Sequence, residues 1–569
     1  MYTASTAFLE ALGEAGVSYI FANLGSDHPA LLEALAEARV NGRAVPTLVT
    51  CPNEMVALSA AHGYAQTTGR AQCVLVHVEC GTQALAGAIH NAAKGRVPVL
   101  IFAGASPFTQ AGEMRGSRNE FIQWIQDVFD QRGLVRGYMR YDNELRTGRN
   151  IKQMVHRALQ FAYSDPKGPV YLMGAREVME EEVPPVTIDP AAWPPIGPAA
   201  LPPQAVEAIV GALADARRPL VVTSYLGRNE AAVAPLVALA NRLGAGVLES
   251  VPSAVNFPHD DPLYQGNQWN EPVQNPALAE ADVILVVDSD VPWIPAHSRP
   301  AADATIIHID TDPLKQQMPL WYIGATQSFR ADAATALDQL NRGLDAVALD
   351  AGKVAERRAH FAARHAARAA RLDALEAAPA DGITPEFLTA RIRAHLGADA
   401  IVVNEGVSNF KTIIDHLRST RPGSMINSGG GSLGWNGGAA IGAKLAHPDK
   451  MVVALTGDGS YMFSVPSTVH WMARQYKTPF LHVVYNNRGW KSPKLSALAV
   501  HPHGHFSRAN DLGVTFDPPP DYAGIAAAAG GALARTVRHA AEVDAALDAA
   551  FAAVRQGQSA VLDVWLPHL

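Results

Sequence analysis

Short, continuous runs of apolar residues alternate with segments of helical periodicity along most of the chain. Continuous runs of this length are typical of parallel strands that are buried on both faces. Helices between such strands are typical of a doubly wound sheet. The expected strands cover residues 19–22, 46–50, 73–78, 97–103, 170–173, 220–224, 246–249, 283–288, 305–309, 401–403, 452–455, 481–485 and 561–565. The pattern therefore predicts an α/β protein.

Two interruptions divide this alternation into three doubly wound parallel-sheet domains. Residues 177–203 pass from an acidic run into repeated prolines, which exclude a regular helix or a central strand and indicate a linker. Residues 346–384 carry an Ala- and Arg-rich helical pattern and form a second linker. The expected domains are residues 1–176, 204–345 and 385–569.

The second linker places four arginines at helical spacings, namely Arg357, Arg364, Arg368 and Arg371. They could form a basic face for an anionic ligand. We expect instead a solvated helix whose arginines form salt bridges.

Composition narrows the class of protein. The chain has 569 residues, a formal net charge of -8 and 48% apolar residues, which fits a soluble globular protein and does not suggest a nucleic-acid partner. The first residues lack the basic start of a signal or transit peptide, and no apolar run approaches the length of a membrane span. The three cysteines lack metal-ligand spacing and indicate reduced thiols. We expect a cytoplasmic protein with no membrane partner.

Polar residues follow two of the expected strands in the third domain. Residues 452–455 lead into the turn Gly-Asp-Gly-Ser at 457–460, and residues 481–485 lead into Asn486-Asn487. Either turn alone would be read as a solvated surface turn. Because both strands of a strand–helix–strand unit end at the same edge of the sheet, Asp458 and the asparagine pair should meet there. A carboxylate and an amide carbonyl are suitable ligands for Mg²⁺.

This combination resembles the cofactor signature of thiamine-diphosphate enzymes, in particular the acetohydroxyacid synthase and benzoylformate decarboxylase group. The resemblance implies a diphosphate-binding set, Gly457, Asp458, Gly459 and Ser460, and a Mg²⁺-binding set, Asp458, Asn487 and the backbone carbonyl of Gly489. The interval from Asp458 to Asn487 is a residue or two longer than is usual in the family. We therefore expect an extended connecting helix, and the choice of Asn487 over Asn486 stays open.

Glu54 is the candidate for activating the cofactor. Thiamine chemistry needs a carboxyl group beside the aminopyrimidine ring, which it protonates at N1′. The segment from Asn53-Glu54 to Gly69 is similar to the family's glutamate segment, although many members have His where this chain has Asn53. Without the resemblance, Glu54 would be read only as a first-turn residue stabilised by the helix dipole.

A glycine-rich segment, residues 429–438, precedes an Ala-rich helix. The resemblance implies that the carbonyl of Gly431 binds the 4′-amino group and that Leu433 wedges the cofactor into its bent shape. Gly437-Gly438 depart from the family pattern, so either the loop is more mobile or another group approaches closely there. Ser408 follows the strand at 401–403, where its hydroxyl and nearby amides could bind diphosphate oxygens at a helix start.

The segment 21–26 resembles the part of benzoylformate decarboxylase-like enzymes that brings a serine toward the substrate carboxylate, and Ser26 stands at that position. His77 stands where those enzymes carry an active-site histidine, with a role as proton donor or acceptor. His501, His503 and His505 are more typical of a lid than of a second metal site.

The resemblance implies an enzyme that uses thiamine diphosphate and Mg²⁺ to break or form a C–C bond next to the carbonyl of a 2-oxo acid. A decarboxylase and an acetolactate synthase-like carboligase are both open, as are a 2-hydroxyacyl-CoA lyase, a catalytically silent homologue and a plain dehydrogenase. FAD is not supported by a motif in the middle domain. The family arrangement further implies a homodimer or homotetramer whose active sites are shared between subunits.

Overall fold

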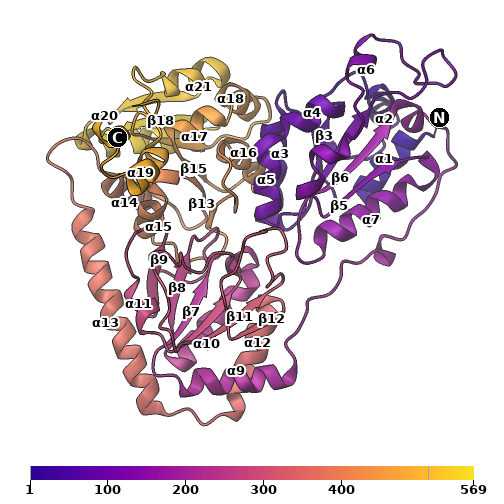
Figure 1. The fold of residues 1–569 in the computed structure, drawn as a ribbon. Coiled ribbons are helices and arrows are strands. Elements are labelled where there is room, and N and C mark those ends of the chain that lie inside the picture. The colour runs from indigo at the N-terminus through magenta and orange to yellow at the C-terminus, as the bar shows by residue number, and fades with distance from the viewer. Residues whose placement is uncertain (1, 510–511) are drawn as a thin grey trace.

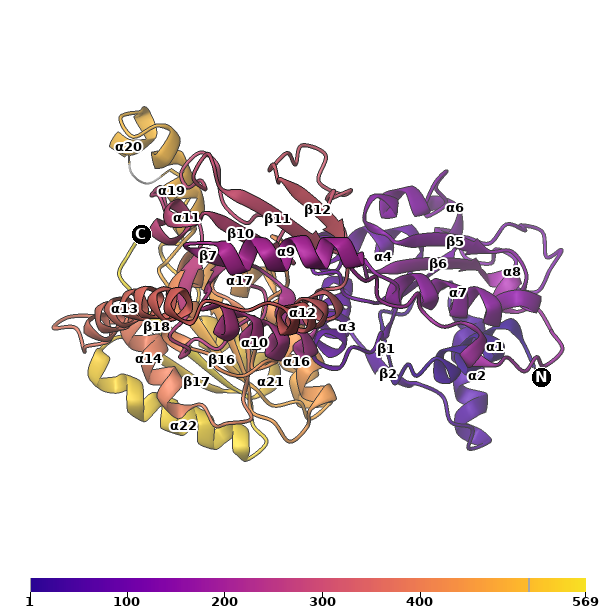
Figure 2. The same ribbon diagram turned by 90° about the horizontal axis from the view of Figure 1, so that it is seen from below.

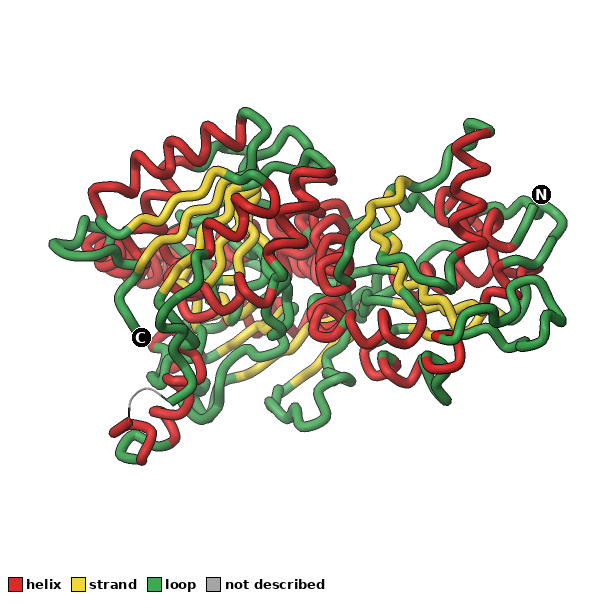
Figure 3. Tube along the Cα trace, turned by 90° about the horizontal axis from the view of Figure 1, so that it is seen from above, coloured by secondary structure: helices red, strands yellow, loops and turns green. Residues whose placement is uncertain are grey.

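The computed structural model describes residues 2–509 and 512–569. It contains three six-stranded sheets whose neighbouring strands are parallel, and helices cover both faces of each sheet (Figures 1 and 3). The predicted fold class, α/β with three doubly wound sheets, is confirmed. Among the described residues, no helix combines the length and the apolar character that crossing a membrane requires.

The first sheet has the strand order β2-β1-β3-β4-β6-β5. Its strands are β1 (Tyr19–Ala22), β2 (Thr47–Thr50), β3 (Cys73–Val76), β4 (Leu100–Ala105), β5 (Tyr141–Leu145) and β6 (Val170–Ala175). The helices around it are α1 (Ala4–Glu14), α2 (Pro29–Val40), α3 (Glu54–Thr68), α4 (Val78–Ala84), α5 (Ala86–Lys94), α6 (Ile122–Ile125), α7 (Ile151–Tyr163) and α8 (Arg176–Met179).

The second sheet has the order β12-β11-β10-β7-β8-β9, the strand order of a dinucleotide-binding fold. Its strands are β7 (Pro219–Thr223), β8 (Gly246–Ser250), β9 (Tyr264–Gln268), β10 (Val283–Val287), β11 (Thr305–Asp310) and β12 (Gln327–Arg330). Its helices are α9 (Pro203–Asp215), α10 (Val233–Leu243), α11 (Pro276–Glu280) and α12 (Ala333–Gly343), followed by the long connecting helix α13 (Ala351–Leu375).

The third sheet has the order β14-β13-β15-β16-β18-β17. Its strands are β13 (Ile401–Glu405), β14 (Met425–Ile426), β15 (Val452–Gly457), β16 (Leu481–Asn486), β17 (Leu533–Val537) and β18 (Ala560–Trp565). Its helices are α14 (Pro385–His395), α15 (Phe410–Leu417), α16 (Asn436–Ala446), α17 (Asp458–Phe463), α18 (Pro466–Gln475), α19 (Lys491–Val500), α20 (His505–Ala509), α21 (Tyr522–Gly530) and α22 (Val543–Arg555). When each sheet is counted from its own first strand, the first and third have the same order.

The apolar pattern does not predict β5, β9, β12, β14 and β17. All five lie at an outer position of their sheets. An edge strand has one neighbouring strand and is partly solvated, so it does not require a continuous apolar run. Thus β5 reads Tyr-Asp-Asn-Glu-Leu and β12 reads Gln-Ser-Phe-Arg.

Helices α3 and α16 join the first domain to the third (Figures 1 and 2). The two backbones pack closely, because a Cβ atom on Gly442 of α16 would overlap the carbonyl oxygen of Ala60 in α3, and one on Gly63 would overlap the backbone of Ala439. Gly438 lies as closely against Ser59 and Val56. Gly437-Gly438 therefore belong to a helix. Of the two explanations given for these glycines, the close approach of another group is the one that holds, and loop mobility is not.

Three of the four arginines of α13 match the expected solvated, salt-bridging helix, because Arg371 is exposed and the other two form ion pairs, but Arg357 departs from it. Arg357 is buried and donates hydrogen bonds to the backbone carbonyls of Leu243 at 3.1 Å and Ala214 at 2.7 Å. The carbonyls that it reaches stand at helix ends, where they lack helical partners. Arg364 pairs with Glu280 and Arg368 with Asp415, so the helix ties the middle domain to the third.

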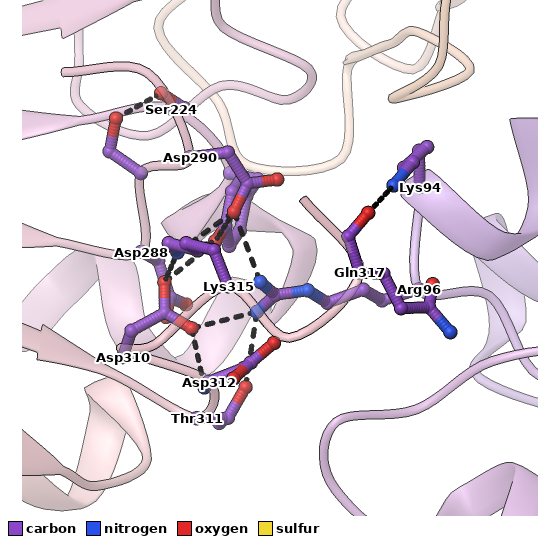
Figure 4. A network of polar contacts seen from close by, with 12 residues as sticks. Lys94, Arg96, Ser224, Asp288, Asp290, Asp310, Thr311, Asp312, Lys315 and Gln317 are labelled. Carbon is purple, nitrogen blue, oxygen red and sulfur yellow. Dashed lines mark hydrogen bonds and ion pairs between the residues drawn. The ribbon is translucent and has the colours of Figure 1, made fainter. Parts of the chain in front are cut away.

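An ionic cluster joins the first domain to the carboxyl edge of the second sheet (Figure 4). Arg96, just after α5, lies 2.8 Å from Asp310 and 3.0 Å from Asp290. Lys315 lies 2.6 Å from Asp310 and 2.8 Å from Asp290, and the Tyr225 hydroxyl lies within hydrogen-bond distance of both carboxylates. Burial alone would raise the pKa of Asp310, but Arg96 and Lys315 hold that pKa below its usual value.

We predict that Arg96→Leu destabilises the protein by about 3–5 kcal/mol, because it leaves buried carboxylates without their partner. The measurement is the loss of stability in urea unfolding followed by circular dichroism. Arg391→Leu is the control, since it removes an exposed pair with Asp544 and should cost at most about 1 kcal/mol. Equal unfolding midpoints for Arg96→Leu and the wild type would contradict the role of the cluster in joining the domains.

We predict that Gly442→Ala lowers stability by about 1–3 kcal/mol, because its methyl group has no space against α3. The matched control is Gly211→Ala in α9, where a Cβ atom meets nothing within 4 Å. That change should stabilise the helix by about 0.5–1 kcal/mol. Differential scanning calorimetry compares the two, and a midpoint that Gly442→Ala raises as Gly211→Ala does would show that helix packing at Gly442 is not tight.

Candidate active site

The predicted residues of the third domain gather at one cavity. A space of about 330 Å³ is lined by every one of them, namely Ser408, Gly431, Leu433, Gly457, Asp458, Gly459, Ser460, Asn487 and Gly489. These residues come from loops and helix starts that follow β13, β14, β15 and β16, at the carboxyl edge of the sheet. The neighbours β13 and β15 form the switch point of this strand order, where doubly wound sheets bind ligands.

Asp458 is the buried first residue of α17. Its carboxylate accepts hydrogen bonds from the backbone amides of Gly459 and Gly489, both at 2.8 Å. Burial nevertheless raises its pKa to about 6, which shows that two amides do not compensate for the loss of water. A cation in the cavity would supply the missing stabilisation of the charge.

Asn487 and Asn486 have different surroundings. The side chain of Asn486 donates to Asp563 at 2.8 Å and accepts from the amide of Arg488 at 3.0 Å, so it is used within the fold. Asn487 Oδ1 is buried and has no hydrogen-bond partner among the described residues. A buried amide oxygen without a partner beside a carboxylate fits a hard cation. The donor set of Asp458 and Asn487 therefore fits Mg²⁺.

The segment between these two ligands does not form the single extended helix that we expected. It folds into α17 and α18, which are separated by Val465 in a left-handed conformation with φ 53°. Pro466 at the first position of α18 accounts for the break, because proline disfavours helical conformation in the residue before it.

A second cavity, of about 440 Å³, shares Gly431 and Leu433 with the first. Residues of all three domains line it, and its walls include Trp269 and Phe410, whose rings stack at 4.2 Å. Glu405 also lines it, and three backbone amides at the start of α16 bind its carboxylate. Burial raises the pKa of Glu405 to about 7, although those hydrogen bonds oppose the shift.

Glu54 opens α3 in the first domain and is buried. Asn53 caps the helix by accepting a hydrogen bond from the amide of Val56 at 3.1 Å. The side-chain amide of Asn23, which follows β1, donates to Glu54 Oε1 at 2.7 Å. Gly81 adjoins the carboxyl group, since a Cβ atom there would lie 3.3 Å from Glu54 Oε1. The acid is thus oriented by Asn23 and closely enclosed.

Ser26 and His77 lie at the switch point of the first sheet, after β1 and β3. The strand predicted at 73–78 ends at Val76, because His77 turns the chain and Val78, with φ 33°, begins α4. The Ser26 hydroxyl is buried and has no partner among the described residues. Asn23 binds Glu54 at 2.7 Å and Gly25 lies against the His77 imidazole, so the segment that carries Ser26 adjoins both other predicted residues of this domain.

The two groups do not meet within one chain. None of Ser26, Glu54 and His77 lines the cavity of Asp458 and Asn487.

The three histidines expected in a lid lie at and after the end of α19. His501, which caps α19, and His503 are exposed, and His505 begins α20. In the described part of the chain, no cluster of three or more His, Cys, Asp or Glu residues could hold a metal ion.

Three models of known protein families match most of the chain. Residues 2–134 match the N-terminal TPP binding domain of thiamine pyrophosphate enzymes, residues 206–340 match the central domain, and residues 406–564 match the C-terminal TPP binding domain. The chain belongs to the thiamine pyrophosphate enzymes. Its cofactor is thiamine diphosphate, and Mg²⁺ is the usual partner metal of this family.

Several relatives match most of the chain. A probable 2-ketoarginine decarboxylase of Pseudomonas aeruginosa is 27% identical over 519 residues, covering 90% of this chain and 87% of that protein. Benzoylformate decarboxylase of the same organism is 26% identical, covering 86% of each. Acetolactate synthase of Bacillus subtilis is 24% identical, covering 84% of this chain and 80% of the synthase. The predicted resemblance to the acetohydroxyacid synthase and benzoylformate decarboxylase group is confirmed.

The fold is also that of solved enzymes. The thiamine diphosphate-dependent 4-hydroxybenzoylformate decarboxylase of Rhodococcus jostii RHA1 superposes with a TM-score of 0.79 at 23% identity, covering 100% of this chain and 99% of that one. Benzoylformate decarboxylase from Polynucleobacter necessarius gives the same TM-score at 20% identity, with the same coverage. These similarities establish the arrangement of all three domains.

Sequence reasoning assigned no role to Asn23, Asp27 or Glu405. Each holds another part of the site: Asn23 orients Glu54, Asp27 binds His77 at 2.5 Å, and Glu405 binds the start of α16. Asn23 and Asp27 follow β1, and Glu405 is the last residue of β13, so all three stand at a carboxyl edge. That position is the signal that could have identified them.

We predict that Asn486→Ala and Asn487→Ala have opposite consequences. Asn486→Ala should lower stability by about 1–3 kcal/mol, because it leaves a backbone amide and Asp563 without their partner. Asn487→Ala should leave the thermal midpoint of the cofactor-free protein unchanged and abolish its rise with thiamine diphosphate and Mg²⁺. Thermal unfolding with and without the two ligands distinguishes them. A ligand-induced rise in Asn487→Ala equal to that of the wild type would exclude Asn487 as a ligand.

Proposed function

We propose that this enzyme cleaves a 2-oxo acid next to its carbonyl, releasing CO₂ and leaving an aldehyde or, with a second carbonyl compound, a ligated product. The observation that carries the proposal is the division of the site into two complementary halves. One half is the cavity that fits diphosphate and Mg²⁺, and the other holds a buried acid, a serine and a histidine. Bound thiamine diphosphate supplies an electron sink for the carbon that loses CO₂.

The third domain provides the binding half. Asp458, Asn487 and the carbonyl of Gly489 would hold Mg²⁺, while Ser408 and the turn at 457–460 would bind the diphosphate. Gly431 and Leu433 would position the rings. The positive end of α17 lies at this cavity and adds favourable electrostatics for an anion.

The first domain provides the reactive half. Glu54 would hold the proton at N1′ of the aminopyrimidine ring, and Asn23 keeps its carboxyl group in one orientation. Ser26 would bind the substrate carboxylate through its hydroxyl, which the fold itself leaves without a partner. His77 would give or take the proton that the reaction needs.

A second copy of the chain would bring these halves together. Within one chain the two halves are separate. Both domains that carry them expose large apolar side chains, namely Phe108, Phe121, Ile125 and Phe129 in the first domain and Met462 and Phe463 in α17 of the third. Exposed apolar surface of this kind is typical of protein interfaces. A dimer in which the first domain of one subunit covers the third domain of its partner would bury it and complete two sites.

We predict that Glu54→Gln lowers kcat by at least about 10²-fold, because the amide cannot exchange the proton that general acid–base catalysis requires. Binding of thiamine diphosphate, measured by tryptophan fluorescence, should change little. The direct measurement is exchange of the cofactor's C2 proton for deuterium. Equal exchange in the variant and the wild type would remove Glu54 from catalysis and favour a catalytically silent protein.

We predict that 2-oxo acids with bulky apolar side chains react with a higher kcat/KM than pyruvate. The second cavity adjoins Gly431 and Leu433, has a volume of about 440 Å³ and carries the stacked Trp269 and Phe410. The measurement is CO₂ release from a panel of 2-oxo acids, with and without aldehyde acceptors, alongside analysis of ligated products. Preference for pyruvate, together with coupling to a second pyruvate, would favour the carboligase.

A further inference from the structure

Asp27 is a buried carboxylate at the point where β1 and β3 end side by side. Its Oδ1 lies 2.5 Å from Nδ1 of His77, and its Oδ2 accepts a hydrogen bond from the backbone amide of Val78 at 3.0 Å. The carboxylate therefore binds both the imidazole and the backbone directly after it. No role for this acid follows from cofactor binding, since it does not line the cavity of Asp458.

Two glycines make space for this pair. A Cβ atom on Gly25 would overlap the His77 imidazole, and a Cβ atom on Gly104 in β4 would overlap the Asp27 carboxylate. Any other residue at these positions would displace one member of the pair. The contact between Asp27 and His77 therefore depends on the backbone of two separate segments.

His28 does not compete for the same role. Its Nδ1 accepts a hydrogen bond from the amide of Gly25 at 3.0 Å, so the proton of the neutral ring is on Nε2. Although Nδ1 is 3.3 Å from Asp27, it has no proton to donate to that carboxylate. Burial also lowers the pKa of His28, which keeps the ring neutral. The imidazole that donates to Asp27 is that of His77.

We propose that Asp27 is a positioning residue that keeps the Nδ1 proton of His77 in place and directs Nε2–H toward the substrate as a proton donor. This inference rests on the proposed function and selects its decarboxylase form. A 2-oxo acid loses its carboxylate as CO₂, and a new C–H bond replaces the broken C–C bond. Nε2 supplies that proton, and the imidazolium becomes a neutral imidazole. His77 then recovers a proton from water, because its side chain is 19% exposed.

The charges around Asp27 and His77 favour the protonated form of the His77 imidazole. The hydrogen bond to Asp27 raises the pKa of His77, burial opposes the rise, and the charge of Asp27 adds to it. The other titratable groups that face the pair are His28, Glu54 in α3 and Tyr171 in β6. Because the donor is the protonated ring, aldehyde release should fall as the pH rises through the pKa of His77.

The test compares Asp27→Asn with the wild type by NMR of ¹⁵N-labelled histidine in the cofactor-free protein. The variant keeps the shape of the side chain and removes its charge, so the pKa of His77 should fall by about 1–3. The alkaline limb of the pH profile of aldehyde release should move to lower pH by the same amount. Gly104→Ala retains Asp27 but displaces its carboxylate, and it should lower the same pKa.

Asp130→Asn is the control, because Asp130 is an exposed acid of the same domain paired with Arg136. Asp130→Asn should change neither the pKa of His77 nor the pH profile of aldehyde release. An unchanged pKa of His77 in Asp27→Asn would overturn the proposal, as would a lowered pKa without a matching shift in the profile. The NMR result does not require turnover. A wild type that releases no CO₂ from any 2-oxo acid would therefore refute the proposed function separately.

Discussion

The packing of α3 against α16 is the contact on which the arrangement of the site depends. Glu54 is the first residue of α3, and α16 begins just after Leu433, so each helix starts at one half of the site. Small residues bring the two backbones together, and the buried residues around them form one core shared by the first and third domains. Through this contact, one rigid interface sets where the chain presents its acid and where it presents its glycine loop, although the two do not share the cavity of Asp458 within one chain.

The three sheets use their switch points in different ways. In the first sheet, the switch point carries the pair of Asp27 and His77 with Ser26, and in the third it adjoins Asp458 and the cavity. In the second sheet, the corresponding edge carries the ionic cluster of Arg96, Asp290, Asp310 and Lys315, which joins this sheet to the first domain. Ser224, Tyr225 and Asp290 at the same edge also line the second cavity.

Prediction from the sequence succeeded where local pattern and buried position agree. Central strands are continuous apolar runs because both faces are covered, and the turn at 457–460 follows such a run directly. The apolar pattern did not predict β5 and β12, because an edge strand is solvated on one side and can carry polar residues. Arg357 was expected in solvent because its spacing is that of a surface helix. Its burial depends on carbonyl groups from distant helix ends, which no local pattern reveals.

The sequence by itself determined the fold class, the family resemblance and the residues that we propose to face the cofactor, because these depend on local periodicity and on turns next to strands. Tertiary structure decided which of Asn486 and Asn487 is available, since only the fold places Asp563 beside the first. It also decided that Asp27 binds His77 across two strand ends, and that the halves of the site remain apart within one chain. These properties depend on contacts between residues far apart in sequence, for which the order of amino acids carries no local signal.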